Sequence, residues 1–360
     1  AGDRENTANF EGKMDEVALF DRALTEAEVS EQVRVAQLPE SPPLSPKQSM
    51  KSIHVRDGFE VELVAAEPFV RDPVAIDWDA DGKLWVSEMA DYPYGIDGKG
   101  KAGGRVRWLE DADANGVFEK SALFLDGLSF PTSVMPWRDG VLITAAPDIL
   151  FARDTDGDGR ADEQQVLFTG FIEGNQQLRV NSLRWGLDGW IYAASGGHHA
   201  GFGVKTEITS TKTGKKIALG SRDFKFRPDS GELEALSGPS QSGRVRDDWG
   251  NWFGVQNSYP LWHYVLPDHY LRRNAFHPAG DPRRQLRGQA PRVFPNKPPQ
   301  KRFHGFDHAG RYTSACGISI YRDVLLFPYS PERMHAFTCE PFHNVVQHHV
   351  LDRDGVTFTA

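Results

Sequence analysis

Cysteine is scarce in this sequence, and what is missing around it excludes several kinds of site. The 360 residues contain only Cys316 and Cys339, with no CxxC pair and no CxxCH motif. A zinc site or a covalently attached haem needs closely spaced cysteines, so the sequence predicts no haem in this chain. The two cysteines form either one disulfide, in an oxidising compartment, or two buried thiols.

Long apolar runs and an excess of positive charge are also absent. No apolar stretch approaches the roughly 20 residues that a membrane-spanning helix needs, so we expect no transmembrane segment in this chain. The formal net charge is −9. Binding to phosphate backbones requires clustered lysine and arginine, so this balance argues against a nucleic-acid partner.

The first 52 residues differ in character from the rest of the chain. The runs Phe10–Val17 and Asp21–Thr25 resemble the end of a laminin-G-like jelly roll, which predicts that residues 1–35 are the C-terminal part of such a domain. Residues 36–52 contain four prolines and are typical of a stiff linker. Within this linker, Ser45-Pro46 followed by Gln48 favours one helical turn.

An internal repeat begins after the linker and carries the fold prediction. Four turn glycines recur at intervals of about 50–60 residues, and a short apolar strand follows each of them. A propeller blade repeats every 40–50 residues or so and tolerates loop insertions. These glycines are Gly82, Gly140, Gly189 and Gly250, and a fifth copy runs from Cys316 to Cys339.

Short strands, turn signals and a fixed internal register predict an all-β fold. We expect residues 53–360 to form a six-bladed β-propeller, with about five blades in this chain and a truncated C-terminus. The segment 59–64 alternates apolar and polar residues, which predicts a half-buried strand that belongs to the last blade. The N-terminal jelly-roll remnant completes the predicted architecture.

Two loops have the spacing of a calcium site. In the first, carboxylates at alternate positions can converge on one hard cation, while Gly159 permits a sharp turn. A weaker copy begins at Asp111 and ends at Glu119. The alternative is that both are Asp/Gly-rich hairpin turns that need no metal. The predicted calcium ligands are Asp154, Asp156, Asp158 and Asp162.

The central funnel of a propeller is built from residues just before and just after each innermost strand. The predicted lead-in residues are polar and basic, and they could hold a polyanionic cofactor or a sugar. After the third innermost strand, His198 and His199 lie between glycines, so a ligand could approach their imidazoles closely. The alternative is that loops are polar for other reasons. The candidate cofactor-binding residues are Arg179, Asn181, Gln241 and Arg244.

Several motifs between about residues 55 and 360 together resemble one family. The motifs are Glu67-Pro68, Asp72-Pro73, Gly82–Val86, Val180–Trp190, Asp247–Phe253, Pro267–Leu271 and Cys339–Asn344. With these motifs the chain is similar to the membrane-bound dehydrogenase domain found in planctomycete-type bacteria, which looks like the soluble glucose and sorbosone dehydrogenase propellers.

This resemblance implies an exported protein of the periplasm or cell envelope that oxidises a sugar or alcohol with pyrroloquinoline quinone and calcium. It also implies that Arg179 and Arg244 pair with the quinone carboxylates and that electrons pass to a cytochrome c domain outside this chain. Related sequences carry a catalytic histidine where Leu178 stands here, and leucine accepts no proton. His198 or His199 would then be the proton acceptor. The alternative function is a non-catalytic propeller that binds carbohydrate or serves as a scaffold.

Overall fold

The structure is a computed structural model in which two compact units are described separately, Ala1–His54 and Val55–Ala360. It describes residues 25–27, 44–197, 206–274, 276, 280–288, 291–294, 310–328, 330 and 333–360. No helix in these ranges is both long enough and apolar enough to cross a membrane.

In the first unit, the predicted helical turn is helix α2 (Pro46–Met50). The side-chain oxygen Oε1 of Gln48 accepts hydrogen bonds from the backbone N and the Oγ of Ser45, at 3.0 and 2.8 Å. A proline at the first helical position needs no backbone donor there, so the sequence Ser45-Pro46 is suited to begin this helix.

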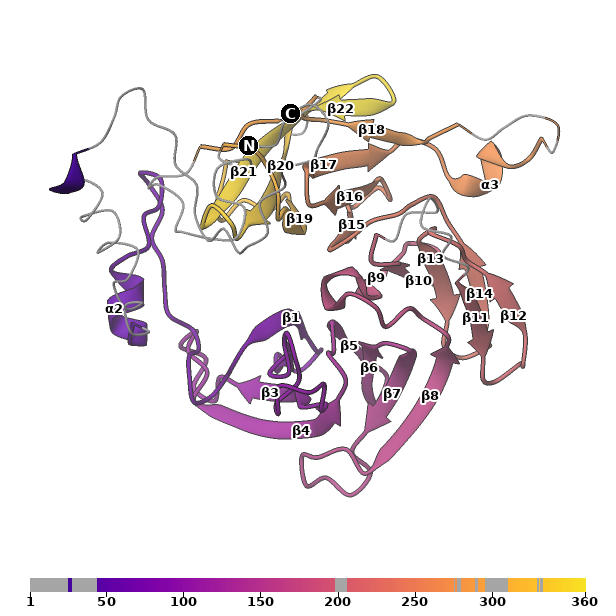
Figure 1. Cartoon of the computed structure of the whole chain (residues 1–360), viewed down its shortest axis with the longest axis horizontal. Coiled ribbons are helices and arrows are strands. Elements are labelled where there is room, and N and C mark those ends of the chain that lie inside the picture. Colours follow the sequence, from indigo (N-terminus) through magenta and orange to yellow (C-terminus); the bar gives the residue numbers. More distant parts are fainter. Residues whose placement is uncertain are drawn as a thin grey trace. The chain divides into compact units, whose positions relative to one another are not determined.

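The second unit is all-β, as predicted, and its described residues form five antiparallel sheets (Figure 1). Sheet one contains β1 (Pro73–Trp78), β2 (Leu84–Glu88), β3 (Gly104–Glu110) and β4 (Lys120–Leu128). Sheet two contains β5 (Ser133–Trp137), β6 (Gly140–Ala145), β7 (Asp148–Arg153) and β8 (Glu163–Thr169), extended at the β8 edge by β11 (Glu207–Ser210) and β12 (Lys216–Ala218).

The remaining three sheets have four strands each. Sheet three contains β9 (Asn181–Trp185), β10 (Ile191–Ala194), β13 (Phe224–Arg227) and β14 (Glu232–Ala235). Sheet four contains β15 (Arg244–Arg246), β16 (Trp252–Gln256), β17 (Tyr259–Tyr264) and β18 (Arg283–Gln285), with α3 (Asp268–Leu271) between its last two strands. Sheet five contains β19 (Cys316–Tyr321), β20 (Arg333–Glu340), β21 (Val345–Asp354) and β22 (Thr357–Thr359).

The five sheets follow one another in chain order, from the purple sheet one to the yellow sheet five in Figure 1. The first strand of each sheet lies beside the first strand of the next: β1 beside β5, β5 beside β9, β9 beside β15 and β15 beside β19. This arrangement of first strands is that of propeller blades. The loops that lead into these strands are therefore brought together.

Aromatic side chains hold neighbouring sheets face to face. Phe168 of sheet two and Phe226 of sheet three are fully buried, and their ring centroids lie 5.2 Å apart. Phe253 of sheet four meets Phe358 of sheet five at 5.4 Å. Replacing one such buried phenylalanine by alanine typically lowers stability by about 3–5 kcal/mol, so these contacts stabilise the packing of neighbouring sheets.

The segment 59–64 is not a strand, contrary to the alternation in its sequence. Val61 and Leu63 remain 37% and 40% exposed. Two isolated contacts hold the segment. The ring centroids of Phe59 and Phe327 lie 5.6 Å apart, and the carbonyl of Val64 accepts a hydrogen bond from the backbone N of Phe118. No strand among the described residues pairs with it, so the alternating side chains have no sheet face to occupy.

Candidate functional site

The four predicted cofactor-binding residues lie in or next to two neighbouring loops, those that lead into β9 and β15. Arg179 precedes β9, Asn181 begins it, Gln241 precedes β15 and Arg244 begins it. Because β9 and β15 lie side by side, their lead-in loops are neighbours, and Asn181 Nδ2 donates to the carbonyl of Gln241 at 2.6 Å. All four residues are at least nine-tenths buried.

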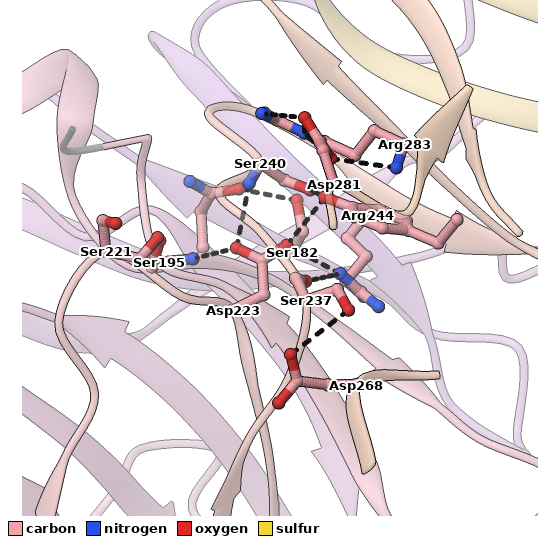
Figure 2. Close-up of polar contacts among 12 residues, drawn as sticks. Ser182, Ser195, Ser221, Asp223, Ser237, Ser240, Arg244, Asp268, Asp281 and Arg283 are labelled. Carbon is pink, nitrogen blue, oxygen red and sulfur yellow. Dashed lines mark hydrogen bonds and ion pairs between the residues drawn. The ribbon is translucent and has the colours of Figure 1, made fainter. Parts of the chain in front are cut away.

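Arg244 is paired with a buried carboxylate of the protein itself (Figure 2). Its Nη1 donates to Asp223 Oδ2 at 2.7 Å and to the carbonyl of Ser237 at 2.9 Å. Asp223 Oδ1 accepts from the backbone N of Ser195 and of Ser240, at 3.0 and 2.9 Å. The carboxylate thus joins two loops of sheet three to the first strand of sheet four.

Two aromatic rings enclose the Arg244 guanidinium. Tyr264 lies 4.1 Å and Trp252 5.3 Å from it, measured from the guanidinium carbon to the ring centroids. The hydroxyl of Tyr264 donates to Asp223 Oδ2 at 3.2 Å and accepts from Ser240 Oγ at 2.7 Å. Burial, followed by the nearby Asp223 charge, raises the pKa of Tyr264, so this hydroxyl stays protonated as a donor. The positive charge of Arg244 is therefore enclosed and neutralised within the protein.

Asn181 and Gln241 also direct their amides at the protein. Asn181 Nδ2 bridges the carbonyls of Arg179 and Gln241, and its Oδ1 accepts from Ser182 Oγ at 2.7 Å. Gln241 Oε1 accepts from the backbone N of Asn257 at 3.3 Å. The Asn181 side chain therefore ties the lead-in loops of β9 and β15 together, and the Gln241 side chain holds the loop between β16 and β17.

Arg179 differs from Arg244 because it has no carboxylate partner among the described residues. Its Nη2 donates to the carbonyl of Glu173 at 2.6 Å, and its Nη1 reaches Ser129 only at 3.4 Å. Its Nε, although buried, has no partner in the described part of the chain. Burial lowers the pKa of Arg179, and the charges of Glu173 and Asp91 oppose that effect.

Phe130 connects Arg179 to a second incompletely paired group. The Arg179 guanidinium lies 4.7 Å from the Phe130 ring centroid, while the Phe130 backbone N donates to Asp91 Oδ2 at 2.8 Å. The other carboxylate oxygen of Asp91 is buried and unpartnered among the described residues. Phe130 has φ of 46°, a conformation that is strained for a bulky side chain and that is often found at functional sites.

The chain after β10 returns over the lead-in loops, which the sequence left undecided. A Cβ on Gly196 would lie 2.1 Å from the carbonyl oxygen of Leu178, and one on Gly197 would lie 2.8 Å from Cβ of Gln241. Both glycines have positive φ, at 95° and 81°. Glycine is therefore required at both positions, for space and for conformation. His198 and His199, the predicted proton acceptors, follow directly and lie outside the described residues.

An exposed surface of tyrosine and glutamine covers the region around Arg179. Gln177 Nε2 donates to the hydroxyl of Tyr92 at 2.6 Å, and Gln176 Nε2 donates to the carbonyl of Pro93 at 2.9 Å. Tyr92 is 48% and Tyr94 72% exposed. We call these four side chains, Tyr92, Tyr94, Gln176 and Gln177, the tyrosine surface.

The predicted calcium loops bring their carboxylates together. Asp154, Asp156 and Asp158 each offer an oxygen within 4.8 Å of the others, as do Asp111, Asp113 and Glu119. Asp162 instead accepts from the backbone N and the Oγ1 of Thr155, at 3.0 and 2.6 Å. The first loop is seated on sheet one, where Trp108 Nε1 donates to the carbonyl of Gly159 at 2.9 Å.

The comparisons with known proteins identify a family but no activity. A family model described as a domain of unknown function, DUF7133, matches residues 45–360. The chain belongs to the DUF7133 family. No curated protein matches it.

Solved structures similar to this DUF7133 chain are distant. A luciferin-regenerating enzyme aligns over 80% of this chain and 78% of its own, with 7% identity and a TM-score of 0.39. A catalytically inactive virginiamycin B lyase from Staphylococcus aureus aligns over 77% and 65%, with 10% identity and a TM-score of 0.35. These values are too low to carry functional information to this chain.

Three buried ionisable residues were not singled out as candidates from the sequence. Asp223, the partner of Arg244, directly precedes the alternating strand β13, where a lone carboxylate gives little signal. Glu340 is fully buried and accepts from the backbone N of Ser314 at 3.0 Å, so it anchors the loop before β19. His343 Nε2 accepts from the backbone N of Gly310, which leaves Nδ1 to donate to Glu340 at 3.4 Å. The Cys339–Asn344 motif was the available signal for this pair.

Cys316 and Cys339 are opposite one another in the β19–β20 ladder, and both are free thiols. Burial raises the pKa of Cys316 to about 12, with smaller contributions from Cys339 and Glu340. Burial also raises the pKa of Cys339. A protonated thiol is a weak nucleophile, so this pair is poorly suited to catalysis.

Proposed function

We propose that this DUF7133 propeller is a carbohydrate-binding module and not an active quinone dehydrogenase. The observation that carries the proposal is the buried pair of Arg244 and Asp223, at 2.7 Å. A cofactor carboxylate would have to replace Asp223 as the partner of this arginine. Breaking a buried ion pair typically costs about 3–5 kcal/mol, so Arg244 does not fit the role of a cofactor ligand.

The tyrosine surface supports the binding function. A sugar presents hydroxyl groups that need donors and acceptors, and apolar C–H faces that pack on aromatic rings. Tyr92 and Tyr94 supply exposed rings, and Gln177 fixes the Tyr92 hydroxyl at 2.6 Å. An aromatic ring that is already held in place loses little freedom on binding, which favours affinity.

One observation favours the dehydrogenase as a second candidate. Arg179 is buried, lacks a carboxylate partner among the described residues and has an unpartnered Nε. A single quinone carboxylate would satisfy it. In that case the electrons would pass to a cytochrome c domain, and the protein would act in the periplasm or cell envelope. Leu178 still lacks the proton-accepting group that such an oxidation requires.

We also propose that calcium binds the loop that contains Asp154, Asp156 and Asp158. Three carboxylates whose oxygens approach within 4.8 Å repel one another, and a hard cation would relieve that repulsion. The loop is hydrogen bonded to Trp108 of sheet one, so bound calcium would stabilise the contact between sheets one and two. Its role would be structural.

Affinity gel electrophoresis tests the binding function. A soluble polysaccharide that the protein recognises will retard its migration. Replacing Tyr94 by alanine should abolish the retardation, since this ring is 72% exposed and its loss leaves the core intact. The matched control is Phe294→Ala, which removes another exposed ring, 82% exposed, away from the tyrosine surface. Equal loss of retardation in both variants would exclude the tyrosine surface as the binding site.

A further inference from the structure

A polar cleft lies between sheet three and the loop that follows β17. Its volume is about 270 Å³. Four of the residues that line it, Ser237, Asp268, Asp281 and Arg283, are labelled in Figure 2. The polar side chains that line the cleft, which we call the arginine cleft, are Arg222, Ser237, Asp268, Arg272, Asp281 and Arg283.

Two aspartates hold the three arginines of this cleft in position. Asp268 is 6% exposed and receives Arg222 Nη1 at 3.4 Å and Arg272 Nε at 2.9 Å. Asp281 receives both Nε and Nη2 of Arg283, at 2.9 and 2.7 Å. Three cations against two carboxylates leave the wall with one excess positive charge.

The guanidinium groups are fixed at one side and keep donors on the other. Arg272 uses only its Nε on Asp268, so both of its Nη groups lack a partner in the described part of the chain. Its side chain is 52% exposed. Arg283, with a side chain 27% exposed, likewise keeps its Nη1 free of any described partner. Guanidinium donors in this arrangement match the two oxygens of a carboxylate or sulfate.

The charge state of the wall is stable near neutral pH. Burial raises the pKa of Asp281, but the hydrogen bonds and the charge of Arg283 outweigh burial and hold the pKa below its ordinary value. The hydrogen bond to Asp281 in turn raises the pKa of Arg283. Asp281 and Arg283 therefore both stay charged near neutral pH.

We propose that the arginine cleft binds an acidic sugar unit, with its carboxylate or sulfate group on Arg272 and Arg283. This inference rests on the proposed carbohydrate-binding function and adds a second, charge-selective site to it. The volume lies just below the roughly 300–1,000 Å³ of drug-sized ligand sites, so it suits one sugar ring.

Isothermal titration calorimetry on the whole chain tests the proposal with four probes: a uronate, a sulfated monosaccharide, the matching neutral sugar and inorganic phosphate. We expect the uronate or the sulfated sugar to bind, and the neutral sugar to bind at least tenfold more weakly. Arg272→Gln should weaken binding by about tenfold or more, because it removes a charge-assisted hydrogen bond. Higher salt should weaken it further.

Arg273→Gln is the matched control, because Arg273 is the exposed neighbour of Arg272 and does not line the cleft. It should leave affinity unchanged. Arg283→Gln provides a second variant, and thermal unfolding checks that each variant is folded. Equal weakening by Arg272→Gln and Arg273→Gln would overturn the site, as would phosphate binding as tightly as the acidic sugar.

The outcomes also separate this inference from the proposed function. If the protein binds a neutral polysaccharide through the tyrosine surface but no acidic sugar, the cleft assignment fails and the carbohydrate-binding function stands. If no carbohydrate of either kind binds, both fail.

Discussion

The buried pair of Asp223 and Arg244 gives the most demanding test of the structure. Asp223 is fully buried and accepts four hydrogen bonds, two from backbone N–H groups, one from Tyr264 and one from Arg244. Asp223→Asn keeps the shape of the side chain but removes its charge. The cation of Arg244 is then left buried without a counter-charge.

The expected loss is about 3–5 kcal/mol in the free energy of unfolding, as for other buried pairs from which one partner is removed. For a domain of this size the melting temperature should fall by roughly 2 °C per kcal/mol, which is about 6–10 °C in total. Urea unfolding followed by fluorescence, together with a thermal melt, measures both quantities.

A surface pair with the same separation is the control. Asp229 and Arg138 also approach to 2.7 Å, but their side chains are 57% and 61% exposed. Asp229→Asn should change stability by less than about 1 kcal/mol, because water screens this pair. Arg244→Met in the Asp223→Asn background should recover part of the loss, since it removes the unpaired cation. If Asp223→Asn and Asp229→Asn melt within about 1 °C of each other, the argument from burial is wrong.

Three further predictions concern pH, calcium and the loop after β10. Burial lowers the pKa of His263 and of His349 to about 4, against about 6.5 in the unfolded chain. The two neutral imidazoles therefore contribute their full stability above pH 6.5, and this contribution is lost as pH falls towards 4. The free energy of unfolding should change by up to about 2.7 kcal/mol per pH unit, because two protons are taken up on unfolding. Urea melts between pH 7 and 5 measure this slope, and an unchanged slope in His263→Gln would contradict the prediction. Calcium should raise the melting temperature of the protein. Asp156→Ala should reduce this rise more than Asp113→Ala does, because Asp156 belongs to the loop that we propose as the calcium site. If the melting temperature of Asp156→Ala still rises as much as that of the unaltered protein, the loop at Asp154–Asp158 does not bind calcium. Gly197→Ala should lower stability by more than 1 kcal/mol, because it places a Cβ against Gln241 at positive φ, and a neutral effect in urea melts would show that the loop lies elsewhere.

Much of the fold could be predicted because each blade carries its own local signals. The turn glycines Gly82 and Gly189 have positive φ and close the hairpins that lead into β2 and β10. Gly250 has positive φ as well and closes the hairpin that leads into β16, whereas Gly140 is the first residue of β6 and the positive φ of that turn is at Arg138. These turns depend on backbone conformation that only neighbouring residues determine, which is why one sequence is enough to locate them.

Features that depend on distant partners could not be predicted. The hairpin β11–β12 lies in the sequence between β10 and β13 of sheet three but joins the edge of sheet two, where Thr209 pairs with Thr169. The alternation of apolar and polar residues around Val61 and Leu63 predicts a strand. A strand also requires a neighbouring strand to pair with, and the sequence of the segment does not indicate one. Local patterns specify what a segment can form and do not specify its neighbours.

The candidate site shows the same division. Arg179 and Asn181 lie at the start of β9, and Gln241 and Arg244 lie at the start of β15, so the contact between these first strands makes their loops neighbours. Whether an arginine faces a ligand or a protein carboxylate depends on tertiary contacts. Asp223 lies 21 residues before Arg244 in the sequence and reaches it only through the packing of sheet four on sheet three. The sequence alone therefore did not show whether these arginines bind a ligand or a carboxylate of the protein.

The most direct test of the carbohydrate-binding function is a dye-linked oxidation assay of the chain after titration with pyrroloquinoline quinone and calcium. The protein should show no saturable quinone binding and no dye reduction with any aldose, while a polysaccharide still retards it in affinity electrophoresis. Quinone-dependent dye reduction that disappears in Arg179→Ala, in a variant that remains folded, would contradict the proposed function and establish the dehydrogenase.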